Sequence, residues 1–173
     1  SLMKRDLESV TSSIFKSRRK LIEKKISVDI LKASIREKKD IVKKASSYVS
    51  HMKTKLTNEK IQMLNTQKDL LEIIKAIDDI TKVTSKLSDA DADAATYGLK
   101  ASLIAKEANS KKAEVQYNST EKLTNQAANR HDDVVKALEK LERSFAHESS
   151  NLKIITDNMK DAFDTLTNTY NDV

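Results

Sequence analysis

The chain has 173 residues, a net charge of +6, one glycine, and no proline, cysteine or tryptophan. A globular chain of this length would carry about twelve glycines and about eight prolines at average usage, so folds rich in tight turns and β-strands are disfavoured. Without cysteine the chain has neither a disulfide framework nor a thiolate metal site. The composition therefore predicts an all-α fold made of long, polar helices.

The first predicted arm, residues 3–87, carries a seven-residue repeat of apolar side chains. With 38% of residues apolar, eleven consecutive matches in one register would arise by chance with odds on the order of one in ten thousand. A strict seven-residue period is typical of helices that wind into a left-handed coiled coil. We name this register position a, and the predicted packing seam there consists of Leu7, Ile14, Leu21, Val28, Ile35, Val42, Val49, Leu56, Met63, Leu70 and Ile77.

The d positions, three residues after each a, mix apolar and polar side chains. Lys24 and Lys38 occupy two of them, and we expect such polar residues to set the helix register. Phe15, Ile22 and other apolar residues fall outside the seam, which is usual for a helix covered by more than one neighbour. A bundle of three or four helices, formed within one chain or by dimerisation, is therefore an alternative to a simple two-helix pair.

The one clear interruption of the pattern lies near the middle of the chain, at residues 88–98. Ser88 followed three residues later by Asp91 is a typical helix N-cap, and acidic residues in a first turn suit the helix dipole. Gly98, the only glycine, follows shortly after. We predict a turn at residues 88–98 that folds the chain into a long antiparallel helical hairpin, with arms of up to about 125 Å at 1.5 Å per residue.

The second predicted arm, residues 99–173, has heptads of its own, and the two arms together are expected to form one elongated domain. Its packing seam is predicted at Leu138, Phe145, Leu152, Met159 and Leu166, with His131 in the same register as a core residue. Closer to the turn the seam thins to Leu99, Leu103, Ala113, Tyr117 and Ala127.

Two internal segments resemble helix starts and leave an alternative open. Residues 118–121 have the pattern of a capping box, and residues 57–59 have a weaker version of it. Kinks or restarts at these places would fold the arms into four shorter helices.

Charge is distributed unevenly along the chain. Residues 1–60 hold 17 basic and 7 acidic side chains, whereas residues 87–173 hold 11 and 15, so the first arm is basic and the second mildly acidic. With a turn centred near residue 92, residue i would lie opposite residue 184−i, and residues 16–44 would keep a surplus near +7. The basic residues repeat at position e, seven residues apart with one interruption: Arg18, Lys25, Lys32, Lys39, Lys53 and Lys60.

The sequence contains no recognisable motif for catalysis, metal binding or phosphate binding. The alternating aspartates of residues 89–93 open like a calcium-binding loop, but Ala94 and Lys100 stand where that loop needs glycine and glutamate. The three histidines lack metal-site spacing, and one glycine is too few for a phosphate loop or a nucleophile elbow. We expect no catalytic residue, metal, cofactor or small-molecule substrate.

The sequence therefore favours a non-enzymatic coiled-coil module that acts as a rod, spacer or oligomerisation scaffold, with a second copy or a helical protein as partner. The alternative is a binder of anionic surfaces that uses the basic stripe, either a membrane-curving helical dimer or, less favoured, a rod that coats nucleic acid. A helical piece of a larger secreted machine is a third interpretation. No run reaches the length of a membrane span and no signal peptide is evident, so we expect a soluble, cytoplasmic chain.

Overall fold

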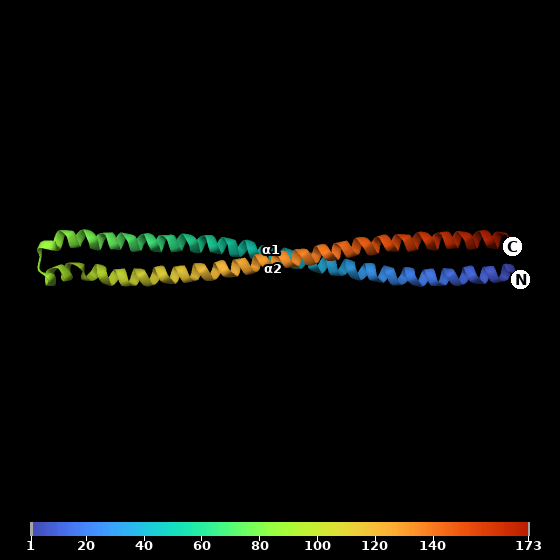
Figure 1. The fold of residues 1–173 in the computed structure, drawn as a ribbon, viewed down its shortest axis with the longest axis horizontal. Helices are drawn as coiled ribbons and strands as arrows, with labels where there is room; N and C mark the ends of the chain where they lie inside the picture. The colour runs from blue at the N-terminus through green and yellow to red at the C-terminus, as the bar shows by residue number, and fades with distance from the viewer. Residues whose placement is uncertain (1, 173) are drawn as a thin grey trace. The chain divides into compact units, whose positions relative to one another are not determined.

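The structure is a computed structural model that describes residues 2–172, and it is all-α. Helix α1 (Leu2–Val83) is followed by the short 3-10 helix η1 (Thr84–Lys86) and then by helix α2 (Asp89–Asn171) (Figure 1). The two long helices pack as a hairpin, and the described residues contain no strand. The predicted helical hairpin is confirmed; residues 1 and 173, the latter the last residue of the predicted second arm, lie outside the described part.

Both helices are continuous, so the alternative of three or four helices within one chain is wrong. Residues 57–59 lie inside α1 and residues 118–121 lie inside α2. Thr57 uses its hydroxyl to donate a hydrogen bond to the carbonyl of Lys53, 3.0 Å away, one turn earlier in the same helix. At both places the sheltered seam runs on without a break, through Leu56 and Glu59 of α1 and through Tyr117 and Thr120 of α2.

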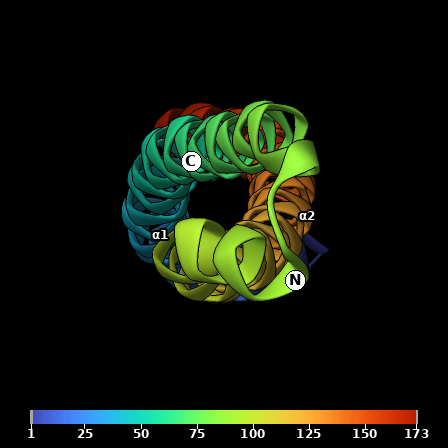
Figure 2. The same cartoon turned by 90° about the vertical axis from the view of Figure 1, so that its left-hand side faces the viewer.

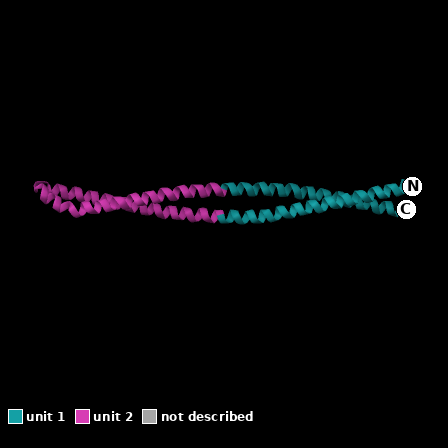
Figure 3. Ribbon diagram, turned by 90° about the horizontal axis from the view of Figure 1, so that it is seen from below, with its two compact units in different colours: residues 1–44, 132–173 teal, residues 45–131 magenta. Residues whose placement is uncertain are grey.

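By their internal contacts the residues divide into two compact units (Figure 3). Unit 1 joins α1 as far as Lys44 to α2 from Asp132 onward, and unit 2 comprises residues 45–131 with the turn between the helices. The sequence predicts one elongated domain, and no pattern in it marks this division.

The chain reverses direction at residues 84–88, in unit 2, and Figure 2 looks onto this turn. The amide of Leu87 donates to the carbonyl of Thr84 at 2.9 Å. The amide of Asp91 donates to the hydroxyl of Ser88 at 3.3 Å, and that hydroxyl donates to a carboxylate oxygen of Asp91 at 2.8 Å. The predicted N-cap at Ser88 is confirmed, with Asp89 and Asp91 in the first turn of α2.

The predicted extent of the turn, residues 88–98, is wrong from Asp89 onward because α2 has already begun there. Gly98 lies within the helix, has no positive φ angle, and a Cβ atom added to it would meet nothing within 4 Å. A single glycine costs a helix only about 1 kcal/mol, which a good cap offsets. The glycine therefore marks no turn.

The earlier turn changes which residues face each other within each unit. Lys24 contacts Glu148 in unit 1, whereas a turn centred near residue 92 would place residue 160 opposite it. Glu59 contacts Gln116 in unit 2, instead of residue 125. The observed pairing is therefore shifted by nine to twelve residues from the predicted one, as a reversal at residues 84–88 requires.

Replacing Gly98 with alanine is expected to stabilise the fold by about 0.5–1 kcal/mol, because alanine keeps the helical conformation at a smaller entropic cost. The space around Gly98 accommodates the added methyl group. Urea unfolding followed by circular dichroism, at one fixed protein concentration, measures the change. A loss of stability would mean that residue 98 needs the freedom of glycine.

Replacing Ser88 with alanine is expected to cost about 1 kcal/mol, because the amide of Asp91 loses its acceptor at the start of α2. The same unfolding measurement applies, and Ser88→Asp is the control because an aspartate caps equally well. If alanine and aspartate left the stability equally unchanged, the cap would have no structural role.

Candidate functional site

The predicted seam of α1 lies along the side that faces α2. All eleven a positions are half-buried or buried, and Val28 and Ile35 are among the most buried apolar side chains of the described residues. The d positions from Val10 to Ile80 are sheltered in the same way, including the polar ones. The seven-residue period therefore corresponds to one packed face.

The seam of α2 continues through residues that the search for apolar repeats missed. Its predicted members from Leu138 to Leu166 are half-buried, and so is His131. Counting back from His131 in sevens gives positions 124, 117, 110, 103 and 96, all of them sheltered. The buried polar side chains of α2 are Thr96, Ser110, Thr120 and Thr124.

Local hydrogen bonds explain how threonines can occupy a helix seam. Thr124 donates its hydroxyl to the carbonyl of Thr120 at 2.7 Å, and Thr96 donates to the carbonyl of Ala92 at 3.0 Å. Bonds of this kind to the preceding turn satisfy the hydroxyl group within its own helix, so burial leaves its donor paired. Because these side chains are small and their hydroxyl groups are already bonded, the opposite helix can pack closely against them, although they offer little apolar surface.

A charged pair crosses the seam of unit 1. The Lys24 ammonium donates to a carboxylate oxygen of Glu148 at 2.7 Å, and both side chains are partly shielded from solvent. The hydrogen bond from Lys24, followed by its charge, holds the pKa of Glu148 below its ordinary value of 4.5, although partial burial acts in the opposite direction. The pair links a d position of α1 to one position of α2, which is how a polar residue can select a register.

A buried carboxylate interrupts the seam of unit 2. Glu59 is only 7% exposed; one of its oxygens accepts a hydrogen bond of 3.3 Å from the side-chain amide of Gln116, and the other has no hydrogen-bond partner among the described residues. A buried oxygen without a donor is costly. Glu59 is therefore expected to lower the stability of the seam.

The predicted basic stripe is exposed along its whole length. Arg18, Lys25, Lys32 and Lys39 belong to unit 1, and Lys53 and Lys60 belong to unit 2. Within residues 2–172 none of these six side chains forms an ion pair, although neighbouring bases do, such as Arg19 with Glu23 at 3.4 Å. Their charges are therefore free to attract an anionic partner.

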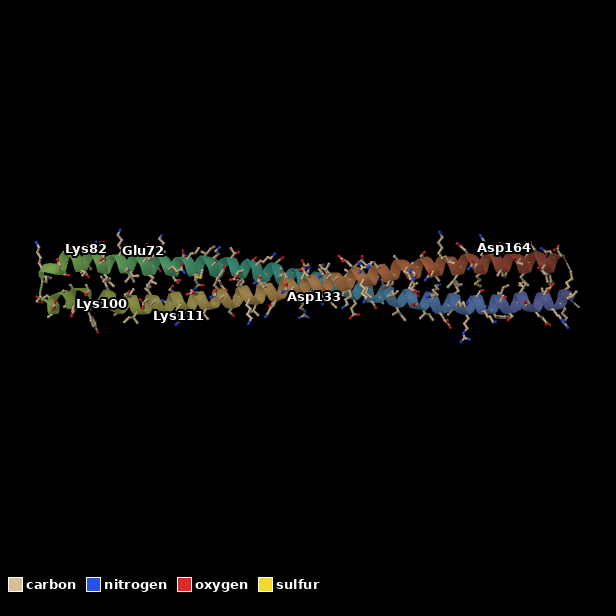
Figure 4. The ribbon with its side chains drawn as sticks, viewed as in Figure 1. Glu72, Lys82, Lys100, Lys111, Asp133 and Asp164 are labelled. Atoms are coloured by element: carbon tan, nitrogen blue, oxygen red, sulfur yellow. The ribbon has the colours of Figure 1, made fainter. Side chains whose placement is uncertain are left out.

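A second feature is an apolar ridge on the outer side of α1 in unit 2, which we call the outer ridge. It consists of Ile61, Leu64, Leu71 and Ile74, and Leu71 is 66% exposed. Successive spacings of three, seven and three residues place these side chains on one side of the helix, away from the seam. Charged side chains such as Glu72 and Lys82 of α1 and Lys111 of α2 also line the outer sides of the helices (Figure 4).

Neither a metal site nor a membrane-spanning helix occurs in the part of the chain that the structure describes. Histidine, aspartate and glutamate side chains nowhere gather in the threes that hold a metal ion, and this includes the aspartates of residues 89–93. No stretch of either long helix is apolar enough to cross a bilayer. The structure therefore brings together the residues of the packing seam. It leaves two sets of side chains on the outer surface, the basic stripe and the outer ridge.

No protein-family model, curated protein or solved structure matches this chain.

Replacing Glu148 with lysine is expected to lower the thermal midpoint at neutral pH, because it sets two ammonium groups against each other in unit 1. Exchanging both residues, Lys24→Glu with Glu148→Lys, should restore most of the loss. A double variant no more stable than the single one would show that the contact is incidental.

The stabilising effect of Glu148 should also depend on pH. Since its pKa is lower in the folded state, its contribution is present above the unfolded pKa and is lost as pH falls through the lowered one. The difference in stability between the natural chain and Glu148→Gln should therefore shrink in acid, which unfolding at a series of pH values measures. A difference that stays constant with pH would contradict the pair.

Replacing Glu59 with leucine is expected to stabilise the fold by about 1–3 kcal/mol, because it removes a buried oxygen without a donor and adds apolar surface to the seam. Gln116 is exposed and can bind water instead. The control is Glu114→Leu, an exposed position of α2 outside the outer ridge, where the change should stay within about 0.5 kcal/mol. Destabilisation by Glu59→Leu, with the control unchanged, would indicate that the carboxylate has a partner that stabilises it.

Proposed function

We propose that the chain is a non-enzymatic coiled-coil module that acts as an oligomerisation scaffold, and that its partner is a second copy. The observation that carries the proposal is the outer ridge, where α1 of unit 2 exposes large apolar side chains at helical spacing. In each unit of Figure 3 the two helices also cross in projection, as expected of helices that wind around one another.

The thin core supports this proposal. Among the described residues only five apolar side chains are buried, and none is less than 2% exposed. Two helices can bury one stripe each, and a small core of this kind is commonly completed by association. A second pair of helices laid on the outer ridge would cover it.

The charge of unit 2 favours a second copy as the partner. Residues 45–131 hold 13 basic and 11 acidic side chains, so two copies can approach with little net repulsion. Lys68, Glu72 and Lys75 place both signs of charge around the ridge, which allows complementary contacts across a two-fold axis.

The strength of the expected association follows from the exposed area. Completing the burial of a half-exposed leucine or isoleucine contributes about 1 kcal/mol, and two ridges together supply about 8 kcal/mol. Association itself costs about 4–15 kcal/mol. The ridge therefore predicts assembly that depends on concentration.

Sedimentation velocity over a range of protein concentrations tests the proposal. We expect the sedimentation coefficient to rise with concentration, and the variant Leu64→Gln with Leu71→Gln to remain monomeric at every concentration. The control, Val115→Gln with Leu123→Gln, removes exposed apolar side chains of α2 in the same unit and should assemble like the natural chain. A natural chain that stays monomeric throughout would contradict the proposal, and so would equal losses in both variants.

A further inference from the structure

Unit 1 has an aromatic groove between the N-terminal part of α1 and the C-terminal part of α2. One shallow hollow lies between the helices, lined by Leu7 and Thr11 of α1 and by Phe163 and Tyr170 of α2. A second hollow shares Leu7 and Thr11 and extends along α1 to Phe15, with one acidic and one basic side chain, Glu8 and Lys16, also in its lining. The three aromatic side chains are 66%, 57% and 72% exposed at positions 15, 163 and 170, so three of the seven aromatic residues of the chain surround this groove without being packed.

The basic stripe of unit 1 continues from the same side of α1. Thr11, which lines both hollows, occupies position e, and Arg18, Lys25, Lys32 and Lys39 follow it at intervals of seven residues. Position e adjoins position b on the helix surface, where Phe15 and Ile22 are exposed. Apolar and cationic side chains therefore alternate along one outward side of the unit.

The opposite helix does not neutralise this side. In the observed register, with Lys24 against Glu148, residues 16–40 of α1 lie opposite residues 132–156 of α2. The first stretch holds ten basic and four acidic side chains, and the second holds four basic and five acidic, so a surplus of +5 remains. The positive surplus in the observed register, +5, is smaller than the value near +7 that the sequence predicts for residues 16–44. It is nevertheless not cancelled.

We propose that the aromatic groove and the unit 1 part of the basic stripe form a docking surface for an anionic phospholipid bilayer. Phosphate and carboxylate groups of the lipids attract the unpaired bases, and each base near the surface strengthens binding about 5-fold. Phe15, Phe163 and Ile22 enter the boundary between headgroups and acyl chains, and Tyr170 keeps its hydroxyl in water.

Chemistry favours a bilayer over other occupants. A nucleic acid would attract the same bases but would leave Ile22 and Ile26 without a role, since aliphatic side chains do not stack on bases as aromatic rings do. A second copy of unit 1 would bring two surplus positive charges together. The surface lies on the membrane and does not cross it, in keeping with the absence of a spanning stretch in the described helices.

This docking surface belongs to a different unit from the outer ridge, so the two proposals can fail separately. The Leu64→Gln, Leu71→Gln variant should lose assembly and still bind vesicles through unit 1. Its affinity for vesicles should fall only because a monomer binds through one docking surface, whereas an assembled pair binds through two.

Fluorescence gives a direct test because the chain has no tryptophan. Phe15→Trp should show a blue shift of its emission with vesicles of phosphatidylcholine and phosphatidylserine, and none with phosphatidylcholine alone. Tyr97→Trp, exposed in unit 2, should show no shift with either. An unchanged emission of Phe15→Trp with anionic vesicles at low salt would overturn the proposal.

Matched charge variants then test which face binds. Lys25→Gln with Lys32→Gln should weaken co-sedimentation with the anionic vesicles about 30-fold. Lys20→Gln with Lys44→Gln removes the same charge from other sides of α1 and should weaken it only a few-fold. Equal losses in the two variants would show general attraction to the positive unit and would overturn the docking face.

Apolar variants separate a bilayer from a nucleic acid. Ile22→Gln with Ile26→Gln should weaken vesicle binding about tenfold or more and leave the mobility shift of a DNA duplex unchanged. Vesicle binding equal to that of the natural chain would show that nothing inserts, and together with tight duplex binding it would assign the stripe to nucleic acid instead.

Discussion

Packing of α1 against α2 along a single seam is the interaction on which the rest of this structure depends. Each helix can bury only the stripe that faces its one partner, and the sheltered positions follow alternating steps of three and four residues. In unit 2 the stripe of α1 is mostly large and apolar, whereas the stripe of α2 contains Ser110, Ala113, Thr120 and Thr124. Because Thr96 and Thr124 each donate their hydroxyl to their own helix, such a seam can include polar side chains that are already hydrogen-bonded.

Because each helix buries only the stripe along the seam, its remaining sides are exposed and can contact a partner. Apolar residues off the seam are exposed for lack of a third helix, and their surroundings differ between the units. The outer ridge of unit 2 lies among charges of both signs, which suits a second copy of the chain. The aromatic groove of unit 1 lies beside unpaired bases, which suits an anionic surface. One fold thereby presents two chemically distinct surfaces.

Much of this architecture was predictable from the sequence, because heptads and caps are local signals. The seam of α1 and the Ser88 cap required only the spacing of residues along one helix. The prediction for Gly98 is wrong because the conformation and surroundings of a glycine depend on the folded structure. Because the turn is misplaced, the sequence predicts residue 160 opposite Lys24, twelve positions from the observed Glu148. The buried threonines were missed because their hydrogen bonds become visible only in a helix, and the aromatic groove because it joins residues far apart in the chain.

Distance measurement between spin labels tests the register of the seam most directly, and the chain suits it because it has no natural cysteine. Labels at Gln62 and Lys112 lie nearly opposite in the observed register of unit 2, in which Glu59 meets Gln116. Labels at Gln62 and Leu123 would be nearly opposite only if the turn were centred near residue 92. The structure predicts that the first pair is closer, with the second displaced by roughly 15 Å along the helix axis. A shorter distance for the second pair would contradict the hairpin as described.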